Sequence, residues 1–122
     1  ADDFEYHDPI VDIYGIDEMT GFLFAIFSST PDLITTVEDE ISIDGIYTSS
    51  WTMVGTFAGV PYEAKGMSIL KFRDKSTSVF YQRDYYSDAD IMVAIPPLDE
   101  LVCGFRNFYR AAVDPNPDFT CP

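Results

Sequence analysis

The sequence predicts a single α+β domain in which an antiparallel sheet lies between two amphipathic helices. Three observations predict it. Two segments carry apolar residues at the spacing that puts them on one face of a helix, and four strand-like runs lie between these segments. Short turn sequences separate the runs, and connections this short join antiparallel neighbours. With 122 residues, the chain is long enough for one domain, residues 1–122, and too short for two ordinary ones.

The first two elements expected along the chain are a strand and a helix. The strand, Asp3–Asp8, is stopped by Pro9. The helix is expected from about Asp17 to Ser28, with Asp17 placed to cap its start and Pro31 just beyond its end. Its apolar face would consist of Met19, Phe22, Leu23, Ile26 and Phe27.

A four-stranded meander and a final helix complete the order strand, helix, four strands, helix. The final helix is expected from about Leu98 to Ala112, after a start signal at Pro96 and Pro97. Its apolar stripe would be Leu101, Val102, Phe105, Phe108 and Tyr109. The four expected strands are Leu33–Ile43, Ile46–Phe57, Tyr62–Arg73 and Thr77–Tyr86.

The pairing of the first two strands of the meander has two alternatives. If the turn between them consists of Asp44 and Gly45 alone, Tyr47 and Trp51 share a face with acidic residues of the preceding strand, which is a poor core pairing. A bulge or a longer turn shifts the register by one residue and removes the conflict. The same pattern places Asp39 on an apolar side, where a carboxylate needs a partner, a wet cavity or a position beyond the covered part of the sheet.

The charge is strongly acidic and unevenly distributed. The chain has 21 acidic and 7 basic residues, a formal net charge of -14. Residues 1–64 hold 13 Asp and Glu and no Lys or Arg, whereas residues 65–122 have a net charge of only -1. Such a field repels phosphate, which argues against binding to nucleic acids or anionic membranes. It fits a well-solvated surface, a high-salt or acidic-lumen habitat, or a basic protein partner, which would contact Asp32, Glu38 and Glu40.

The two cysteines, Cys103 and Cys121, indicate either a disulfide bond or two free thiols. A bond would tie the tail to the preceding helix and contribute about 3 kcal/mol by loop entropy. No C-x-x-C spacing occurs and His7 is the single histidine, so we expect no metal site and no cofactor. The start Ala-Asp-Asp fits removal of a signal peptide from an exported or organelle-lumen protein, and it fits trimming equally. No apolar run approaches the ~18 residues of a membrane span.

Four sequence segments, taken in order, resemble one known family. Residues 4–9 (FEYHDP) are similar to a first strand that ends in an acidic residue and a proline, and residues 51–59 (WTMVGTFAG) are similar to a central hairpin. Residues 66–73 (GMSILKFR) and 83–88 (RDYYSD) are similar to the strands that follow. The family is the nuclear transport factor 2-like, or SnoaL-like, superfamily, which includes ketosteroid isomerases, SnoaL-like polyketide cyclases and scytalone dehydratases.

The resemblance covers residues 3–93 and leaves residues 94–122 as a C-terminal helix and tail. It implies a curved antiparallel sheet that forms a cone around a pocket. Family domains usually begin with two helices ahead of the first strand, whereas this chain starts almost at that strand. Either those helices have been cut away, or another chain or the C-terminal helix covers the opening, because an uncovered apolar face usually marks an interaction surface.

The resemblance also implies candidate catalytic residues. Asp8 aligns with the residue that is similar to the proton-shuttling base of ketosteroid isomerases, a carboxylate that takes a proton next to a carbonyl. In ketosteroid isomerases, two hydrogen-bond donors hold the enolate oxygen. One is a tyrosine on a helix that this sequence lacks, and the other is an aspartic acid whose nearest match here is Ser68. Asp84, Arg83 and Asp39 are comparable with the Asp-Arg-Asp set of limonene epoxide hydrolases. Adjacent strand residues diverge, however, and a structural salt bridge from Arg83 is the alternative.

The implied pocket suits a small apolar ligand. The residues expected to line it are His7, Tyr47, Trp51, Met53 and Ser68. Neighbours on a strand face opposite ways, so His7 and Asp8 cannot both point into one pocket without a bulge, and a surface role for His7 is the alternative. For the other residues, the alternative is that they form an aromatic stripe in an ordinary hydrophobic core and contact no ligand.

Two functions from different classes follow. The first is a non-catalytic binding or assembly domain, an accessory subunit that contacts a partner protein or a second copy of itself. The incomplete catalytic set and the acidic first half motivate it. The second is a small-molecule enzyme, a SnoaL-like cyclase, isomerase or dehydratase, in which Asp8 is the general base and Asp84 or Tyr47 assists. Ligand carriage without chemistry is a third alternative.

Overall fold

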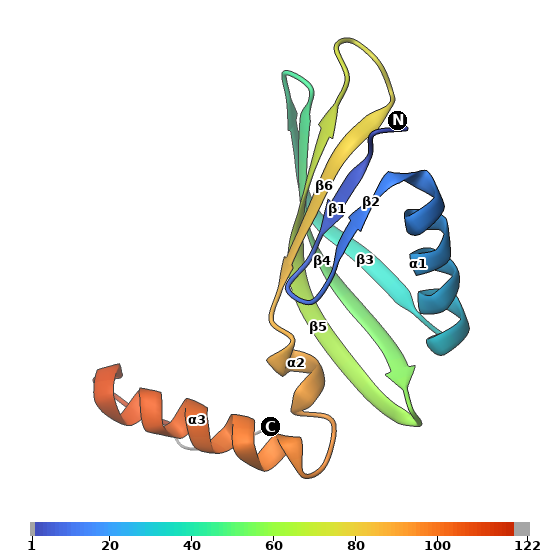
Figure 1. Ribbon diagram of the computed structural model, residues 1–122. Coiled ribbons are helices and arrows are strands. Elements are labelled where there is room, and N and C mark those ends of the chain that lie inside the picture. Colours follow the sequence, from blue (N-terminus) through green and yellow to red (C-terminus); the bar gives the residue numbers. More distant parts are fainter. Residues whose placement is uncertain (1, 119–122) are drawn as a thin grey trace.

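The computed structural model describes residues 2–118 as one six-stranded curved sheet with three helices (Figure 1). The α+β class and the predicted order are confirmed, and a short strand and a short helix are added to them. In chain order the elements are β1 (Glu5–His7), β2 (Asp12–Tyr14), α1 (Gly15–Ser29), β3 (Ile34–Ile43), β4 (Ile46–Phe57), β5 (Val60–Phe72), β6 (Val79–Tyr86), α2 (Ala89–Met92) and α3 (Leu98–Val113).

The sheet is mixed, because β1 pairs with β6 in parallel. The strand order is β2-β1-β6-β5-β4-β3, in which β3 to β6 form the predicted antiparallel meander. In the parallel pair, Tyr6 lies opposite Gln82. The chain can turn back after β1 because Asp8 Oδ1 accepts hydrogen bonds from the backbone N–H groups of Ile10 and Val11, both at 2.8 Å.

Both a two-residue turn and a bulge occur between β3 and β4. Asp44 and Gly45 have φ values of 49° and 76°, as a tight hairpin turn requires, and Ile43 pairs directly with Ile46. The register then shifts between Val37 and Asp39, so that Val37 lies opposite Trp51. The bulge in the middle of the strand, and not the turn, therefore removes the predicted conflict for Trp51. Tyr47 keeps it, because it still lies opposite Ser42 and bonds to Glu40.

Helix α1 lies over one face of the curved sheet (Figure 1). Met19, Phe22 and Ile26 are half-buried, whereas Phe24 and Phe27 are 76% and 59% exposed. The helix begins earlier than expected and Asp17 does not cap it. Tyr14 occupies the cap position without a side-chain cap bond, and the Glu18 carboxylate accepts the Tyr14 N–H at 2.8 Å.

Helix α3 extends away from the sheet (Figure 1), so most of its predicted apolar stripe stays uncovered. Only Val102 of this helix is buried among the described residues. The exposed fractions of Leu101, Phe105, Phe108 and Tyr109 are 68%, 68%, 77% and 58%. No helix within residues 2–118 is long and apolar enough to cross a membrane.

Candidate active site

A cavity of about 750 Å³ lies between α1 and the face of the sheet that α1 covers. Its wall combines aliphatic side chains, among them Ile26, Leu33, Met53 and Leu70, with several aromatic rings. The aromatic residues include Tyr6, Phe22, Tyr47, Trp51, Phe57 and Tyr86. A concave, largely apolar space with a few polar groups is the usual form of a small-molecule site.

The polar groups of the cavity form one chain of hydrogen bonds. Trp51 Nε1 donates to Ser68 Oγ at 2.8 Å, and Ser68 Oγ lies 2.6 Å from Asp84 Oδ1. Because an indole N–H can only donate, the hydroxyl proton of Ser68 is directed to Asp84. Gln82 Nε2 also donates to Asp84 Oδ1, at 3.1 Å. These donors hold the Asp84 carboxylate in one orientation.

Tyr6 connects Asp84 to Asp8. Its phenol oxygen lies 2.9 Å from Asp84 Oδ2 and 3.0 Å from Asp8 Oδ2, and the side chain is only 5% exposed. Burial, and then the negative charges of Asp84 and Asp8, raise the pKa of Tyr6 well above its ordinary value, so the phenol keeps its proton. A phenol has a single proton, which it can donate to either carboxylate in turn.

Tyr86, on the same strand as Asp84, also lines the cavity. Burial, followed by the charges of Asp8 and Asp84, raises its pKa above the ordinary value of 10.0. The cluster therefore presents two carboxyl groups beside two neutral phenols, which suits it to accept a proton and to donate hydrogen bonds.

Comparisons with known proteins define the fold. No family model and no curated protein matches the chain. A protein of ketosteroid isomerase-like fold from Catenulispora acidiphila, in complex with trimethylamine, superposes with a TM-score of 0.73 at 18% identity, over 81% of this chain and 78% of that one. A SnoaL-like polyketide cyclase candidate from Jannaschia sp. CCS1 superposes with a TM-score of 0.67 at 19% sequence identity, over 80% of this chain and 73% of that one. An LEH-like epoxide hydrolase from M. tuberculosis superposes with a TM-score of 0.66 at 14% sequence identity, over 86% of this chain and 76% of that one. The chain has the nuclear transport factor 2-like fold.

Most site residues expected from the sequence lie together in this nuclear transport factor 2-like cone. The cavity is lined by Asp8, Tyr47, Trp51, Met53, Ser68 and Asp84. The hydrogen-bond chain described above joins four of them. Tyr47 is not part of that chain, because its phenol donates to Glu40 Oε2 at 2.5 Å.

His7 was expected in the pocket, but it does not line the cavity. Strand alternation turns it to the opposite face from Tyr6. There, His7 Nδ1 lies 2.5 Å from Asp12 Oδ1 and Nε2 lies 3.2 Å from Glu5 Oε2, and its ring contacts the ring of Tyr14. The hydrogen bonds with Asp12 and then Glu5 raise the pKa of His7 above 6.5. This histidine lies on the other face of the sheet, as strand alternation favours, but it is buried there with only 7% of its surface exposed, so the expected surface role is not borne out.

The Asp-Arg-Asp comparison with epoxide hydrolases does not hold in this cone, because only Asp84 lines the cavity. Arg83 faces away from it, and its Nε donates to the Tyr81 phenol at 2.7 Å. The bulge in β3 places Asp39 opposite Ser50, whose Oγ accepts the Asp39 N–H at 3.2 Å.

The three acidic residues suggested as partner contacts are exposed, and each accepts a hydrogen bond from β4. Asp32 accepts from Thr56 N and Oγ1 at 3.0 and 2.7 Å, which lowers the pKa of its carboxyl. Glu38 accepts from Thr52, and Glu40 from Tyr47. A role for these carboxylates in partner binding stays a prediction.

Three residues of the site were missed from the sequence: Tyr6, Gln82 and Tyr86. Their signal is the two-residue spacing that puts Tyr6 on the side of Asp8, and Gln82 and Tyr86 on the side of Asp84. This spacing has meaning only once β1 is known to lie beside β6.

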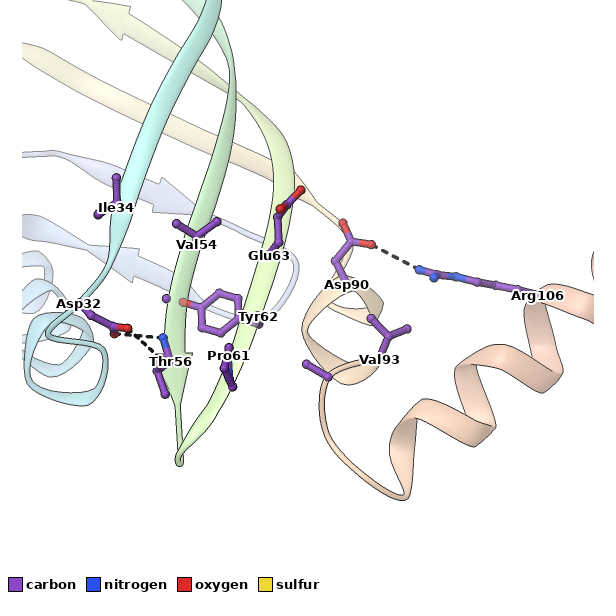
Figure 2. A pocket seen from close by; sticks show the side chains of 12 residues that line it. Asp32, Ile34, Val54, Thr56, Pro61, Tyr62, Glu63, Asp90, Val93 and Arg106 are labelled. Atoms are coloured by element: carbon purple, nitrogen blue, oxygen red, sulfur yellow. Dashed lines mark hydrogen bonds and ion pairs between the residues drawn. The ribbon is translucent and has the colours of Figure 1, made fainter. Parts of the chain in front are cut away.

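A second concavity of about 890 Å³ lies on the other side of the sheet (Figure 2). We call it the outer groove. It is lined by apolar side chains of β3 to β5, such as Ile34 and Val54, by Val93 directly after α2, and by Asp32 and Glu63. At its α3 end, Arg106 Nη2 pairs with Asp90 Oδ1 at 3.3 Å.

Cys103, which lies in α3, is disulfide-bonded and not a free thiol, so the alternative of two free thiols does not hold. Its expected partner, Cys121, is outside the described residues. Among residues 2–118, no group of three or more His, Cys, Asp and Glu side chains is placed to hold a metal ion.

Proposed function

We propose that this chain is a small-molecule enzyme of the SnoaL-like kind, which moves a proton on an apolar ligand held in the cavity. The observation that carries the proposal is the pair of carboxyl groups, Asp8 and Asp84, that contact one buried phenol at 3.0 and 2.9 Å. The solved structures with this fold include a polyketide cyclase candidate and an epoxide hydrolase, and one neighbour is in complex with trimethylamine. They support a small-molecule ligand for this chain as well.

In the proposed mechanism, Asp8 takes a proton from a carbon next to a carbonyl group. Tyr6 then donates its own proton toward one carboxylate while it accepts from the other, so that the abstracted proton can be shared between Asp8 and Asp84. Ser68 and Gln82 keep Asp84 oriented for this exchange. Tyr86 supplies a neutral hydrogen-bond donor to the developing enolate oxygen. A proton taken at one carbon can return at another, which is the chemistry of an isomerase. If the enolate instead attacks a second carbonyl group of the ligand and the proton goes to the resulting alkoxide, the reaction is that of a cyclase.

Hydrogen–deuterium exchange tests this proposal without knowledge of the product. A panel of small apolar ketones, incubated with the protein in D₂O, is expected to include a compound whose C–H next to the carbonyl exchanges faster than in buffer. Asp8→Asn is expected to reduce the accelerated rate by about 10² to 10⁴, the usual contribution of a general base. Mass spectrometry measures the deuterium content.

Asp39→Asn is the matched control for this experiment, because it removes one carboxylate of the same kind from an exposed position outside the cavity. This variant is expected to catalyse deuterium exchange into the ketone at the wild-type rate. Catalysed exchange that is equally fast in Asp8→Asn, or no catalysed exchange across the panel, would contradict the proposal.

Self-association is the second candidate function, and the uncovered stripe of α3 favours it. Two phenylalanines of this stripe, Phe105 and Phe108, are 68% and 77% exposed. We propose that α3 of a second copy occupies the outer groove (Figure 2), where Asp32 and Glu63 complement the arginines of α3. This would make the chain an assembly domain, with or without catalysis.

Replacing both Phe105 and Phe108 by serine is expected to convert a dimer into a monomer, because the apolar contact that drives association is lost. Light scattering after size-exclusion chromatography measures the mass. Glu100→Ser is the control, because Glu100 is an exposed polar residue of the same helix outside its apolar stripe. A wild-type protein that is monomeric at high concentration excludes this second candidate.

A further inference from the structure

The charge of the cavity has a single sign. Asp8 and Asp84 line it, and none of the described residues that line it is Lys, Arg or His. Asp8 accepts hydrogen bonds from the N–H groups of Ile10 and Val11, and Asp84 accepts from Ser68 and Gln82. The Tyr6 phenol lies within hydrogen-bond distance of both carboxyl groups. Two carboxyl groups therefore face the cavity, and no cationic side chain stands among the described residues that line it.

The same cavity is rich in aromatic rings beside these carboxylates. The rings of Trp51 and Tyr86 lie 6.2 Å apart between centroids, and those of Tyr6 and Phe22 lie 5.2 Å apart. The faces of such rings attract a cation that has lost its water, and tryptophan does so most strongly. Carboxylates and aromatic faces therefore favour the same kind of ligand.

We propose that this cavity takes an organic cation, a small tertiary or quaternary amine whose remaining groups are apolar. The proposal rests on the proposed function in one respect, namely that the cavity is the ligand site. Apolar walls such as Met53 and Leu70 would contact the carbon skeleton, while the carboxylates and ring faces surround the charge. The 13 acidic residues in the first 64, with no Lys or Arg among them, would also attract a cation over a longer range.

A set of three isosteric probes tests the charge preference directly. Choline is the cation, 3,3-dimethylbutan-1-ol has nearly the same shape without charge, and 3,3-dimethylbutanoate is an anion of similar shape. Trp51 is the single tryptophan of the chain and lines the cavity, so its fluorescence reports binding there. Choline is expected to bind at least about tenfold more tightly than the alcohol, and the anion is expected not to bind, because carboxylates attract one charge and repel the other.

Two variants assign the preference to the cavity and not to the overall charge of the protein. Asp84→Asn is expected to reduce the ratio of choline to alcohol affinity by several-fold and leave alcohol binding unchanged. Asp39→Asn removes one charge at an exposed position outside the cavity and is expected to keep the wild-type ratio.

Equal affinity for choline and the alcohol, preference for the anion, or absence of choline binding would each overturn the cation proposal. The deuterium exchange experiment separates this failure from failure of the enzyme proposal. If choline is not preferred but an uncharged ketone undergoes exchange that depends on Asp8, the enzyme proposal stands and the cation proposal fails. Selective choline binding without any catalysed exchange would keep the cation site and reject the proposed chemistry.

Discussion

The Gly66→Ala variant is expected to be less stable than the wild-type protein by about 3 kcal/mol, the upper part of the range for overpacked cores. A Cβ atom at Gly66 would lie 2.5 Å from the Tyr85 carbonyl oxygen and 2.6 Å from Cη2 of Trp51. Backbone cannot move away at small cost within paired strands, so the indole ring has to shift. That shift would break the bond between Trp51 Nε1 and Ser68. Urea unfolding measures the stability loss, and Trp51 fluorescence reports the displaced ring.

Gly21→Ala is the matched control, because Gly21 lies inside α1 and a Cβ there meets nothing within 4 Å. Alanine is the better helix former, so this variant is expected to gain about 0.5–1 kcal/mol. If Gly66→Ala is as stable as the wild-type protein and keeps its fluorescence, the position of the Trp51 ring against β5 is wrong, and the hydrogen-bond chain to Asp84 loses its first member.

Asp84→Asn is expected to reduce catalysed deuterium exchange by about 10² to 10⁴ while the fold is retained. Asparagine has nearly the shape of aspartate, and its oxygen can still accept from Ser68 and Gln82. Its amide N–H₂ can donate to the Tyr6 oxygen, which then directs its proton to Asp8. Geometry is thereby preserved, whereas the second proton acceptor is lost. Exchange rates measured by mass spectrometry, with circular dichroism for the fold, separate the two effects.

Ser68→Ala provides the comparison for Asp84→Asn. It removes one donor to Asp84 but keeps the carboxylate, so a smaller loss of exchange is expected, about tenfold for one hydrogen bond worth roughly 1.5 kcal/mol. Exchange by Asp84→Asn at the wild-type rate would show that Asp84 serves the structure of the cavity and not its chemistry. An equal loss in both variants would assign the effect to the orientation of the carboxylate.

Local sequence determined most of the elements of this protein. The apolar spacing along Met19, Phe22 and Ile26 located α1, and the strand Ile46–Phe57 has the predicted bounds. The turn at Asp44 and Gly45 was also predicted from the sequence, because Asp-Gly is one of the few residue pairs that adopt two successive positive φ angles at small cost. Periodicity and turn chemistry act over a few residues, so they can be read without knowledge of the rest of the chain.

The sequence also indicated Asp8, Ser68 and Asp84 as candidates, but it could not join them into one cluster. Tyr6 was missed, although its phenol is the group that contacts both carboxylates. His7 was placed in the pocket, and the alternation of β1 turns it to the other face. The contact of Tyr6 with both carboxylates depends on which strand lies beside β1, and the face that His7 takes depends on which side of β1 is turned toward the cavity.

What only the tertiary structure decided is the set of long-range pairings. The parallel pairing of β1 with β6 brings Tyr6 and Asp8 to Asp84, and the bulge in β3 turns Val37 toward Trp51 while it leaves Asp39 outside the cavity. The physical reason is that strand pairing is chosen by the burial and hydrogen bonding of the whole sheet, to which residues far apart in the chain contribute together. The sequence by itself therefore determined the elements and the chemical types at the site, and the tertiary structure determined which of them meet.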